Sequence, residues 1–198
     1  MEGYKCFNKD RTNRYGKQFV EGETYTASRE IGYGNDRYGY HMCKNLSDVF
    51  RFFDVKSGDY SVAQVTGIGK CVSSGDEDYY GYSDMFSFES IRINKFLTRE
   101  EIIEKMLECD IPYLLQHFFQ TFPLTEDERI RFAKKYRTEF EIMRHLLYYQ
   151  FGFQDAYYYN SSNYEEVLKR INMEQTERGQ AYGQDSNQGC ERKQLKKH

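Results

Sequence analysis

The sequence has 198 residues, which is enough for one domain of ordinary size or for a small domain with a helical extension. Its formal charge is −3, from 28 Lys and Arg against 31 Asp and Glu, and this balance argues against a protein whose main task is to coat nucleic acid. The overall charge does not exclude a local basic patch. Aromatic residues make up 17% of the chain, with 19 Tyr and 15 Phe, so we expect a core built from rings.

The cysteines are widely spaced and form no CxxC pair. An odd number of sparse cysteines is typical of free thiols in a reducing compartment, rather than of disulfides or a structural zinc site. The opening residues MEGYKCFNKD show no signal-peptide pattern, and no apolar run of about 18 residues follows. We therefore expect a soluble cytoplasmic protein that enters no membrane and needs no cofactor. The five cysteines are Cys6, Cys43, Cys71, Cys109 and Cys190.

The first half of the chain has strand character. Four segments predict strands, namely GYKCFN, KQFVEGETYTA, YSVAQVTGIGKCVS and FSFESIRINKFL. In the last segment the apolar residues share one face only if the strand slips between Phe88 and Ile91, so we expect a bulge or bend there. The segment GIGKC, residues 67–71, predicts a β-turn. LSDVFRFF has apolar residues at helical spacing and predicts a short helix.

From Thr98 onwards the pattern becomes helical. TREE and TEDE, which begin at Thr98 and Thr125, are capping boxes at helix starts. Between them, Asp110 is the predicted N-cap of a helix that has Pro112 near its first position. The second capping box predicts one long helix that runs to about Phe151, and SNYEEVLKRI predicts a last helix. The residues expected to be buried where the helices pack are Leu114, Leu115, Phe118 and Phe119.

These patterns predict an α+β protein. We expect a small mixed or antiparallel sheet with a short helix, followed by a C-terminal part of three to four helices. The predicted segments are an α+β domain over residues 1–97, a helical domain over 98–173 and a disordered tail over 174–198. The tail is predicted from its composition, because only four of its 25 residues are apolar.

His41 and Cys43 stand two residues apart in GYHMCKNLSDVFRFF, residues 39–53. On a strand they would share one face, with their Cα atoms about 7 Å apart. Two ligands are too few for zinc, and the other histidines lie in the helical part or the tail. We therefore predict structural roles, with Cys43 as a small buried hydrophobic residue and His41 bonded to a neighbouring loop.

Several segments of the first half carry a resemblance to a known family. In chain order they are YKCFNKDRTNRYGKQFVEGETYTASREI, YGYHMCKNLSDVFRFF, SVAQVTGIGKC and IRINKFLTREEI. Residues 3–107 thereby resemble an uncharacterised domain family that is common in phages and bacteria and has a GFHxCxN motif. The helical part after Cys109 has no counterpart there. The resemblance implies an evolutionary setting of phages and mobile elements.

One enzyme hypothesis comes from a second resemblance. The segment GYHMCKNLSDVFRFF is similar to the second motif of mono-ADP-ribosyltransferases, which use NAD and line the nicotinamide pocket with such a strand and helix. The resemblance implies that Arg11 or Arg14 anchors the ribose and that Glu89 stabilises the oxocarbenium-like charge. Gln64 stands where related sequences tend to carry an acid.

Two tyrosine-rich segments predict binding surfaces. The loop of residues 73–90 combines acids with tyrosines and has no basic residue, so it either contacts a basic protein surface or is a solvated hairpin loop. In DAYYYNSSNY, three consecutive tyrosines cannot all be buried on one side, so at least one ring should be exposed. The predicted partner-binding residues are Asp76, Glu77, Asp78, Tyr79, Tyr80, Tyr82, Asp84, Tyr157, Tyr158 and Tyr159.

Taken together, these features predict a non-enzymatic accessory protein of a phage or mobile element that binds and inhibits a host protein. The most concrete version is an anti-CRISPR-type inhibitor of a basic, nucleic-acid-handling defence enzyme in the bacterial cytoplasm. The overall charge argues against direct binding of nucleic acid by the chain itself. The alternative is a mono-ADP-ribosyltransferase-like enzyme that uses NAD.

Overall fold

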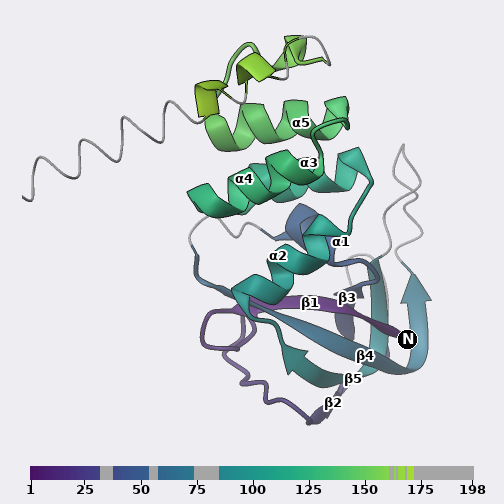
Figure 1. Ribbon diagram of the computed structural model, residues 1–198. Coiled ribbons are helices and arrows are strands. Elements are labelled where there is room, and N and C mark those ends of the chain that lie inside the picture. The colour runs from purple at the N-terminus through teal and green to yellow at the C-terminus, as the bar shows by residue number, and fades with distance from the viewer. Residues whose placement is uncertain are drawn as a thin grey trace, which may run out of the picture. The chain divides into compact units, whose positions relative to one another are not determined.

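The computed structural model describes residues 1–31, 38–53, 58–73, 85–160, 163, 165–167 and 169–171. The chain divides into two compact units, Met1–Ala156 and Tyr157–His198. It has the α+β composition that the sequence predicts (Figure 1). The elements in chain order are β1 (Glu2–Asn8), β2 (Thr24–Thr26), β3 (Tyr40–Cys43), α1 (Leu46–Phe52), β4 (Tyr60–Ser73), β5 (Met85–Phe96), α2 (Arg99–Leu107), α3 (Pro112–Thr121), α4 (Glu126–Lys135), α5 (Phe140–Leu146), the π-helical turn η1 (Leu147–Phe151) and the 3-10 turn η2 (Ala156–Tyr158).

The strands form one antiparallel sheet that closes on itself (Figure 1). β1 pairs with β3 along one edge and with β4 along the other, in a register that runs unbroken from Glu2↔Thr66 to Asn8↔Tyr60. β5 completes the ring because it pairs with β4 on one edge and with β3 on the other. β2 pairs with the same edge of β5 as β3, further along the strand. Closure leaves few exposed strand edges.

Aromatic and aliphatic side chains fill the inside of the closed sheet, as the composition predicts. Phe88, Ile91 and Ile93 all belong to this core, so β5 changes face between Phe88 and Ile91, where the sequence predicts a bulge or bend. The remaining buried members are Phe7, Phe19, Met42, Ala63, Val65 and Phe96.

The extra residue at this irregularity lies on β4 and not on β5. The pairing passes from Ile68↔Ser90 to Cys71↔Phe88, so between these two pairs β4 contains one residue more than β5. Residues 67–71 therefore continue β4 through a bulge, and the predicted β-turn there is wrong. Gly69 supplies the positive φ of 81° that the bulge requires.

The predicted strand KQFVEGETYTA is wrong over most of its length, because only Thr24–Thr26 form a strand. The preceding residues are held by other hydrogen bonds to β5. Gly22 N donates to Ile93 O at 2.7 Å, and the Glu21 carboxylate accepts from Phe96 N at 2.8 Å. These bonds fix a turn that carries Phe19 into the core.

Both predicted capping boxes form. Glu101 N donates to Thr98 Oγ1 at 3.2 Å, and Glu128 N donates to Thr125 Oγ1 at 3.4 Å, with the reciprocal carboxylate bonds also present. The predicted N-cap Asp110 is wrong, since Ile111 is the N-cap of α3 and makes no side-chain bond. Pro112 begins the helix and has no amide hydrogen that a cap would need to satisfy.

The long helix predicted from the second capping box is broken. α4 ends at Lys135, and α5 begins only at Phe140. Tyr136 directly follows α4, and its hydroxyl reaches the carbonyl oxygens of Met106, Leu107 and Cys109 at the end of α2. The break lets α5 pack against α3 as well as α4. η1 ends at Phe151, and Gly152 is its C-cap, which agrees with the predicted stop at Gly152.

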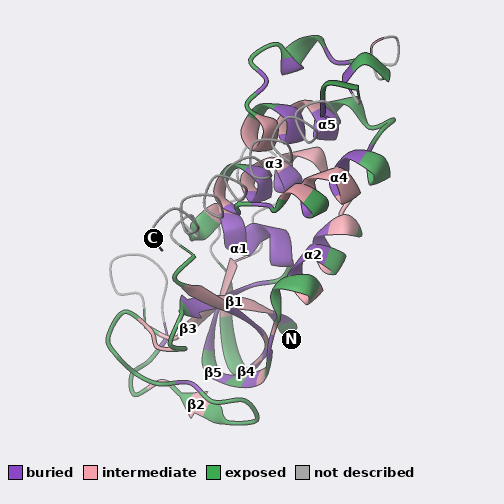
Figure 2. Cartoon of the chain, turned by 60° about the vertical axis from the view of Figure 1, so that its left-hand side comes forward, coloured by how far each residue is buried: buried purple, intermediate pink, exposed green. Residues whose placement is uncertain are grey.

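The predicted stripe on α3 is buried, with Leu114, Leu115, Phe118 and Phe119 each at most 2% exposed (Figure 2). α1 contacts β1, β3, α2 and α3, so it joins the closed sheet to the helices. Phe50 of α1 lies edge-on to Phe118, with ring centroids 5.0 Å apart. The predicted boundary between domains at Leu97 stays a prediction.

Residues 165–167 and 169–171 are helical, and Val167 and Ile171 are buried as predicted for the last helix. Tyr164, Leu168 and the predicted tail lie outside the described residues. Within the described part of the chain, no helix combines the length and apolar character that crossing a bilayer requires.

Candidate functional site

The acidic part of the predicted partner-binding surface lies outside the described residues. This applies to Asp76, Glu77, Asp78, Tyr79, Tyr80, Tyr82 and Asp84. The strands on either side are described. Because Ser73 pairs with Phe86 near the end of β4, the segment connects two strands that are paired neighbours.

The tyrosines of the second cluster differ in exposure. Tyr157 is 77% exposed and Tyr158 is 73% exposed, whereas Tyr159 is only 1% exposed. The sequence therefore predicted correctly that at least one ring faces solvent. Since the ring of Tyr159 is buried, Tyr157 and Tyr158 are the two members available for contact.

Short-range hydrogen bonds hold the backbone that follows the exposed tyrosines. Tyr158 O accepts from the side-chain amides of Asn160 at 3.1 Å and Asn163 at 3.0 Å. Asn160 N donates to the Asn163 side chain at 2.9 Å. The rings of Tyr157 and Tyr158 stand almost perpendicular, at 88°, with centroids 6.0 Å apart. The two exposed rings thus project from a hydrogen-bonded turn.

The residues of the transferase hypothesis lie apart. Arg11 lies at one end of β5, where its guanidinium is 4.5 Å from the ring centroid of Phe96. Glu89 lies on β5 seven residues before Phe96, which is about 23 Å along the strand. The Glu89 carboxylate accepts from Lys70 N at 3.3 Å, and Arg14 lies over Tyr15. The structure does not bring these three residues into one site.

The thiols near the strand–helix unit are buried. Cys43 is 2% exposed, and burial, reinforced by the charge of Asp48, raises the pKa of its thiol to about 12. Burial likewise raises the pKa of Cys6 to about 11. Thiols with such pKa values stay protonated at neutral pH and are poor nucleophiles. These properties agree with the structural role predicted for Cys43.

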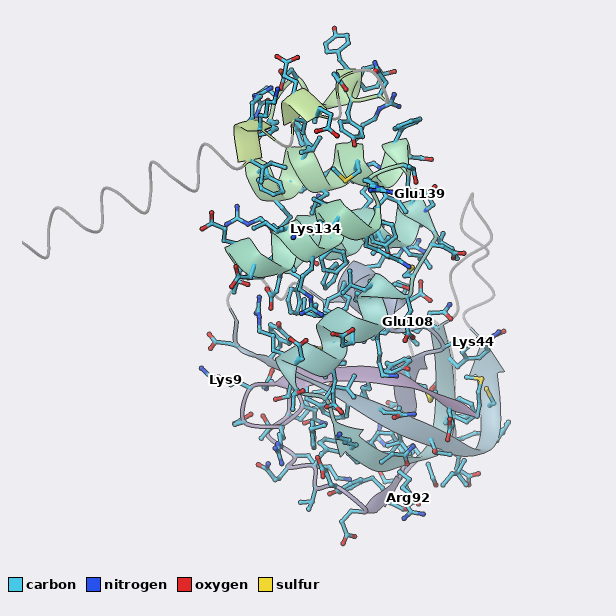
Figure 3. The ribbon with its side chains drawn as sticks, viewed as in Figure 1. Lys9, Lys44, Arg92, Glu108, Lys134 and Glu139 are labelled. Carbon is cyan, nitrogen blue, oxygen red and sulfur yellow. The ribbon has the colours of Figure 1, made fainter. Side chains whose placement is uncertain are left out.

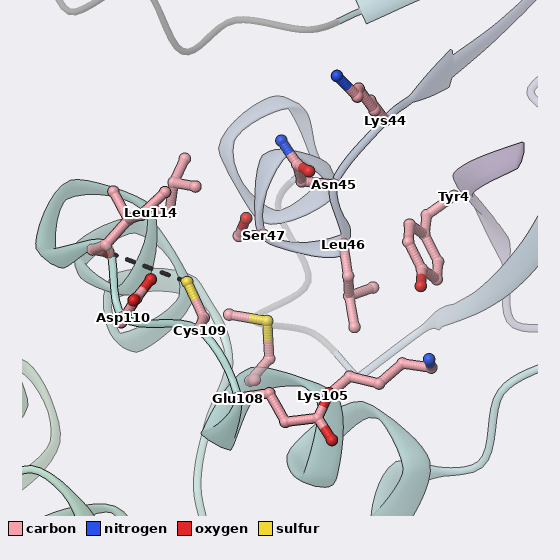
Figure 4. A pocket seen from close by; sticks show the side chains of 12 residues that line it. Tyr4, Lys44, Asn45, Leu46, Ser47, Lys105, Glu108, Cys109, Asp110 and Leu114 are labelled. Atoms are coloured by element: carbon pink, nitrogen blue, oxygen red, sulfur yellow. Dashed lines mark hydrogen bonds between the residues drawn. The ribbon is translucent and has the colours of Figure 1, made fainter. Parts of the chain in front are cut away.

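A shallow pocket of about 360 Å³ lies where α1 begins and α2 ends (Figure 4). Lys44 and Lys105 contribute positive charge to its lining, and Glu108 and Asp110 contribute negative charge. Burial raises the pKa of Cys109, which also lines the pocket, so its thiol is not activated. The mixed charge favours no single class of ligand.

Lys5 is a feature that the sequence analysis missed. It shares a face of β1 with Phe7, and its ammonium donates to His41 O at 2.6 Å and lies 5.7 Å from the Phe7 ring centroid. Burial, reinforced by the charge of Arg14, lowers the pKa of Lys5 to about 8. The alternation of Gly3, Lys5 and Phe7 in the predicted strand was the available signal.

The fold is a small closed antiparallel sheet joined to helices by α1 and α2, and a family model covers that sheet. Residues 1–105 match a domain of unknown function, DUF7666. The chain therefore belongs to the DUF7666 family, and the predicted resemblance to an uncharacterised domain family is confirmed. Searches of the curated proteins and of the solved structures returned no match.

Proposed function

We propose that this member of the DUF7666 family is a protein-binding protein that acts without a catalytic step, and that Tyr157 and Tyr158 belong to its docking surface. The observation that carries the proposal is the 77% and 73% exposure of two adjacent rings. Among the other aromatic side chains of the described chain, Tyr15, at 76%, is the only one exposed to a similar degree. Exposed tyrosines supply large, rigid contact areas with a polar tip, and such residues dominate the energetics of many interfaces.

The local geometry supports this role. The bonds from Asn160 and Asn163 to Tyr158 O order the turn before a partner arrives. A segment that is already ordered loses less conformational entropy on binding, so more of the contact energy appears as affinity. Asn163→Ala should therefore weaken binding although its side chain need not touch the partner.

The identity of the partner is the finer part of the proposal and rests on the sequence. The resemblance supports a phage or mobile-element accessory protein in the cytoplasm of a bacterial host, with a nucleic-acid-handling defence enzyme as the inhibited partner. Asp76, Glu77 and Asp78 would add a negative field that speeds encounter with a basic enzyme. An anti-CRISPR-type inhibitor is the most specific form.

The test is affinity capture from a bacterial lysate followed by mass spectrometry. Wild-type protein is compared with the double variant Tyr157→Ser/Tyr158→Ser and with Tyr148→Ser, which removes another ring that is 48% exposed. We expect one protein to be captured by the wild type and by Tyr148→Ser, and to be lost with the double variant.

Two further results bear on the proposal. Replacing Asp76, Glu77 and Asp78 by Asn, Gln and Asn should weaken capture at low salt and have less effect at high salt. Equal capture of the same partner by the wild type and the Tyr157→Ser/Tyr158→Ser variant would show that the tyrosine pair is not the docking surface.

A further inference from the structure

A small, well-bonded hairpin follows β1 and covers residues 9–19. Thr12 forms a bridge with Gln18, and Asn13 N donates to Lys17 O at 3.1 Å. At the tip, Asn13 Oδ1 accepts from Tyr15 N and from Lys17 N, both at 3.0 Å. These bonds give the tip a defined shape before any ligand binds.

The base of the hairpin is fixed to the core. Phe19 is 1% exposed, and its ring centroid lies 4.8 Å from that of Phe7. Phe19 N donates to Arg11 O at 3.0 Å, and the Gln18 side chain donates to Asp10 O at 2.8 Å. The hairpin is therefore a rigid projection of the closed sheet. Figure 3 shows Lys9, where it begins, beside the end of β1.

The hairpin is strongly basic, although the chain is acidic overall. Residues 9–19 contain four basic residues and one acid, a net charge of +3. The acid, Asp10, accepts hydrogen bonds from Thr12 N at 3.1 Å and Thr12 Oγ1 at 2.7 Å. Lys9 lies 3.9 Å from Asp59, but both side chains are more than 70% exposed, so this pair is weak. The four basic residues are Lys9, Arg11, Arg14 and Lys17.

The other three cations contact rings instead of acids. In the part of the chain that the structure describes, Arg11, Arg14 and Lys17 form no ion pair. The Arg14 guanidinium lies 4.8 Å from the ring centroid of Tyr15. The Lys17 ammonium lies 4.9 Å from the centroid of Tyr25 and 2.9 Å from Tyr40 Oη. No carboxylate of the described chain pairs with these three side chains, so their positive charges can face an external anion.

Tyr15 gives this basic hairpin a stacking surface. Its ring is 76% exposed at the tip, between Arg14 and Gly16. Gly16 has a positive φ of 78° and carries no side chain that would cover the neighbouring ring. A ring that faces solvent beside a guanidinium offers both a stacking partner and a positive charge.

We propose that the hairpin of residues 9–19 is a binding surface for single-stranded nucleic acid. Proteins that bind single strands without sequence preference combine cations that follow the backbone with aromatic rings on which bases stack. Arg11, Arg14 and Lys17 would contact phosphates, and Tyr15 would stack on one base. The proposal departs from the expectation set by the overall charge, because that charge is unevenly distributed along the chain.

The geometry favours a single strand over other anionic partners. In a duplex the bases are already stacked on one another, so a single protruding ring has no base to contact. An acidic peptide would satisfy the cations but would leave the Tyr15 ring unused. The hairpin shares no residue with the Tyr157 and Tyr158 surface, so this inference does not depend on the proposed function.

The test measures fluorescence anisotropy of a labelled oligothymidylate of about 15 nucleotides with the full chain. With three phosphate contacts, the logarithm of the association constant should fall with the logarithm of salt concentration at a slope of about −2. Tyr15→Ala should weaken binding roughly tenfold. Arg14→Ala should weaken it and make the slope shallower by about 0.7.

The controls remove matched groups elsewhere. Lys134→Ala/Lys135→Ala removes two exposed charges from α4, and Tyr157→Ala removes an exposed ring, so each should change affinity less than twofold. All variants are checked by thermal melting, since exposed substitutions usually alter stability by less than about 0.5 kcal/mol. Absence of binding at about 20 mM salt would overturn the proposal. A second pair of results would also overturn it: Tyr15→Ala binds as tightly as wild type, and poly-L-glutamate competes as well as the oligonucleotide. Those results would indicate that the ligand of the hairpin is an acidic protein.

Discussion

Arg99 on α2 forms a two-pronged ion pair with Glu128 on α4. Its Nε and Nη2 atoms each lie 2.7 Å from a different carboxylate oxygen of Glu128. Glu128 is 7% exposed and also completes the capping box of α4 with Thr125. One carboxylate therefore both starts α4 and ties it to the helix that follows the closed sheet.

Replacing Glu128 by Gln should lower the free energy of unfolding by roughly 1–3 kcal/mol at neutral pH. Gln can still complete the capping box, so the loss measures the charge that faces Arg99. Urea denaturation of the two proteins gives the difference. Glu126→Gln is the matched control because Glu126 is in the same first turn and forms no ion pair within the described chain. An equal loss in the control would mean that Arg99 is not the cause.

The same pair predicts a dependence on pH. Burial raises the pKa of Glu128, but the hydrogen bonds from Arg99 and Thr125 and the charge of Arg99 together outweigh burial and hold the pKa below its usual value. A carboxyl group with a lowered pKa in the folded state stabilises the fold above the pKa of the unfolded state, about 4.3, and loses this contribution as the pH falls. The stability difference between wild type and Glu128→Gln should therefore shrink in acid. A difference that stays constant down to about pH 2 would contradict the assignment.

Tyr136→Phe should destabilise the protein by about 1–2 kcal/mol. The hydroxyl of Tyr136 lies 2.9 Å from Leu107 O and 3.2 Å from Met106 O, which are carbonyls at the end of α2. Removing it leaves these acceptors without that donor. Thermal unfolding measures the effect, and Tyr148→Phe at a half-exposed ring should change nothing. A Tyr136→Phe protein as stable as wild type would show that water replaces the hydroxyl.

Lys5→Met should stabilise the protein near neutral pH by about 1–2 kcal/mol, because it removes a cation that loses solvation in the fold. The pKa of Lys5 is lowered from 10.5 to about 8, so between these values the unfolded chain binds more protons than the folded one. Wild-type stability should therefore rise relative to the variant as the pH goes from 8 to 10.5. Denaturation curves across this range test it. A difference between the proteins that is independent of pH would refute it.

Gly3→Ala should disrupt the closure of the sheet. A Cβ atom at Gly3 would lie 2.3 Å from Cys43 O, which belongs to the backbone of β3 and cannot move alone. We expect a loss of at least about 2 kcal/mol in unfolding free energy. Glu2→Ala, at the exposed neighbouring position, should leave stability unchanged. If Gly3→Ala is tolerated to the same degree, β1 and β3 do not approach as closely as the structure shows.

Local patterns in the sequence predicted the helices and strands that nearby residues determine. Short runs of strand character predicted β1, β4 and β5, and the capping boxes predicted the starts of α2 and α4. The break after α4 could not be predicted, because no local pattern marks it. Tyr136, which follows α4, bonds to a carbonyl 30 residues earlier in the chain, and a local pattern does not show such a long-range contact. Closure of the sheet likewise depends on the pairing of β4 and β5 with strands distant in sequence.

For the candidate surfaces, too, the sequence predicted local features but not those that depend on packing. Three consecutive tyrosines cannot all be buried on one side, so the sequence predicted exposure in the second cluster. That Tyr159 is the buried one could not be predicted, because its burial depends on packing rather than on local pattern. The basic hairpin was missed because the charge was considered for the whole chain, although four of the eleven residues 9–19 are Lys or Arg.

The central claim is that the protein acts by binding through Tyr157 and Tyr158, and an inhibition titration tests it most directly. The enzyme captured from the lysate is assayed on its own substrate while wild type, Tyr157→Ser/Tyr158→Ser or Tyr148→Ser is added in increasing amount. The account predicts that wild type and Tyr148→Ser reduce the activity to a plateau at a fixed molar ratio, without NAD, while the double variant requires at least about tenfold more protein. Equal inhibition by wild type and the double variant, or inhibition that needs NAD and continues at substoichiometric amounts, would contradict it.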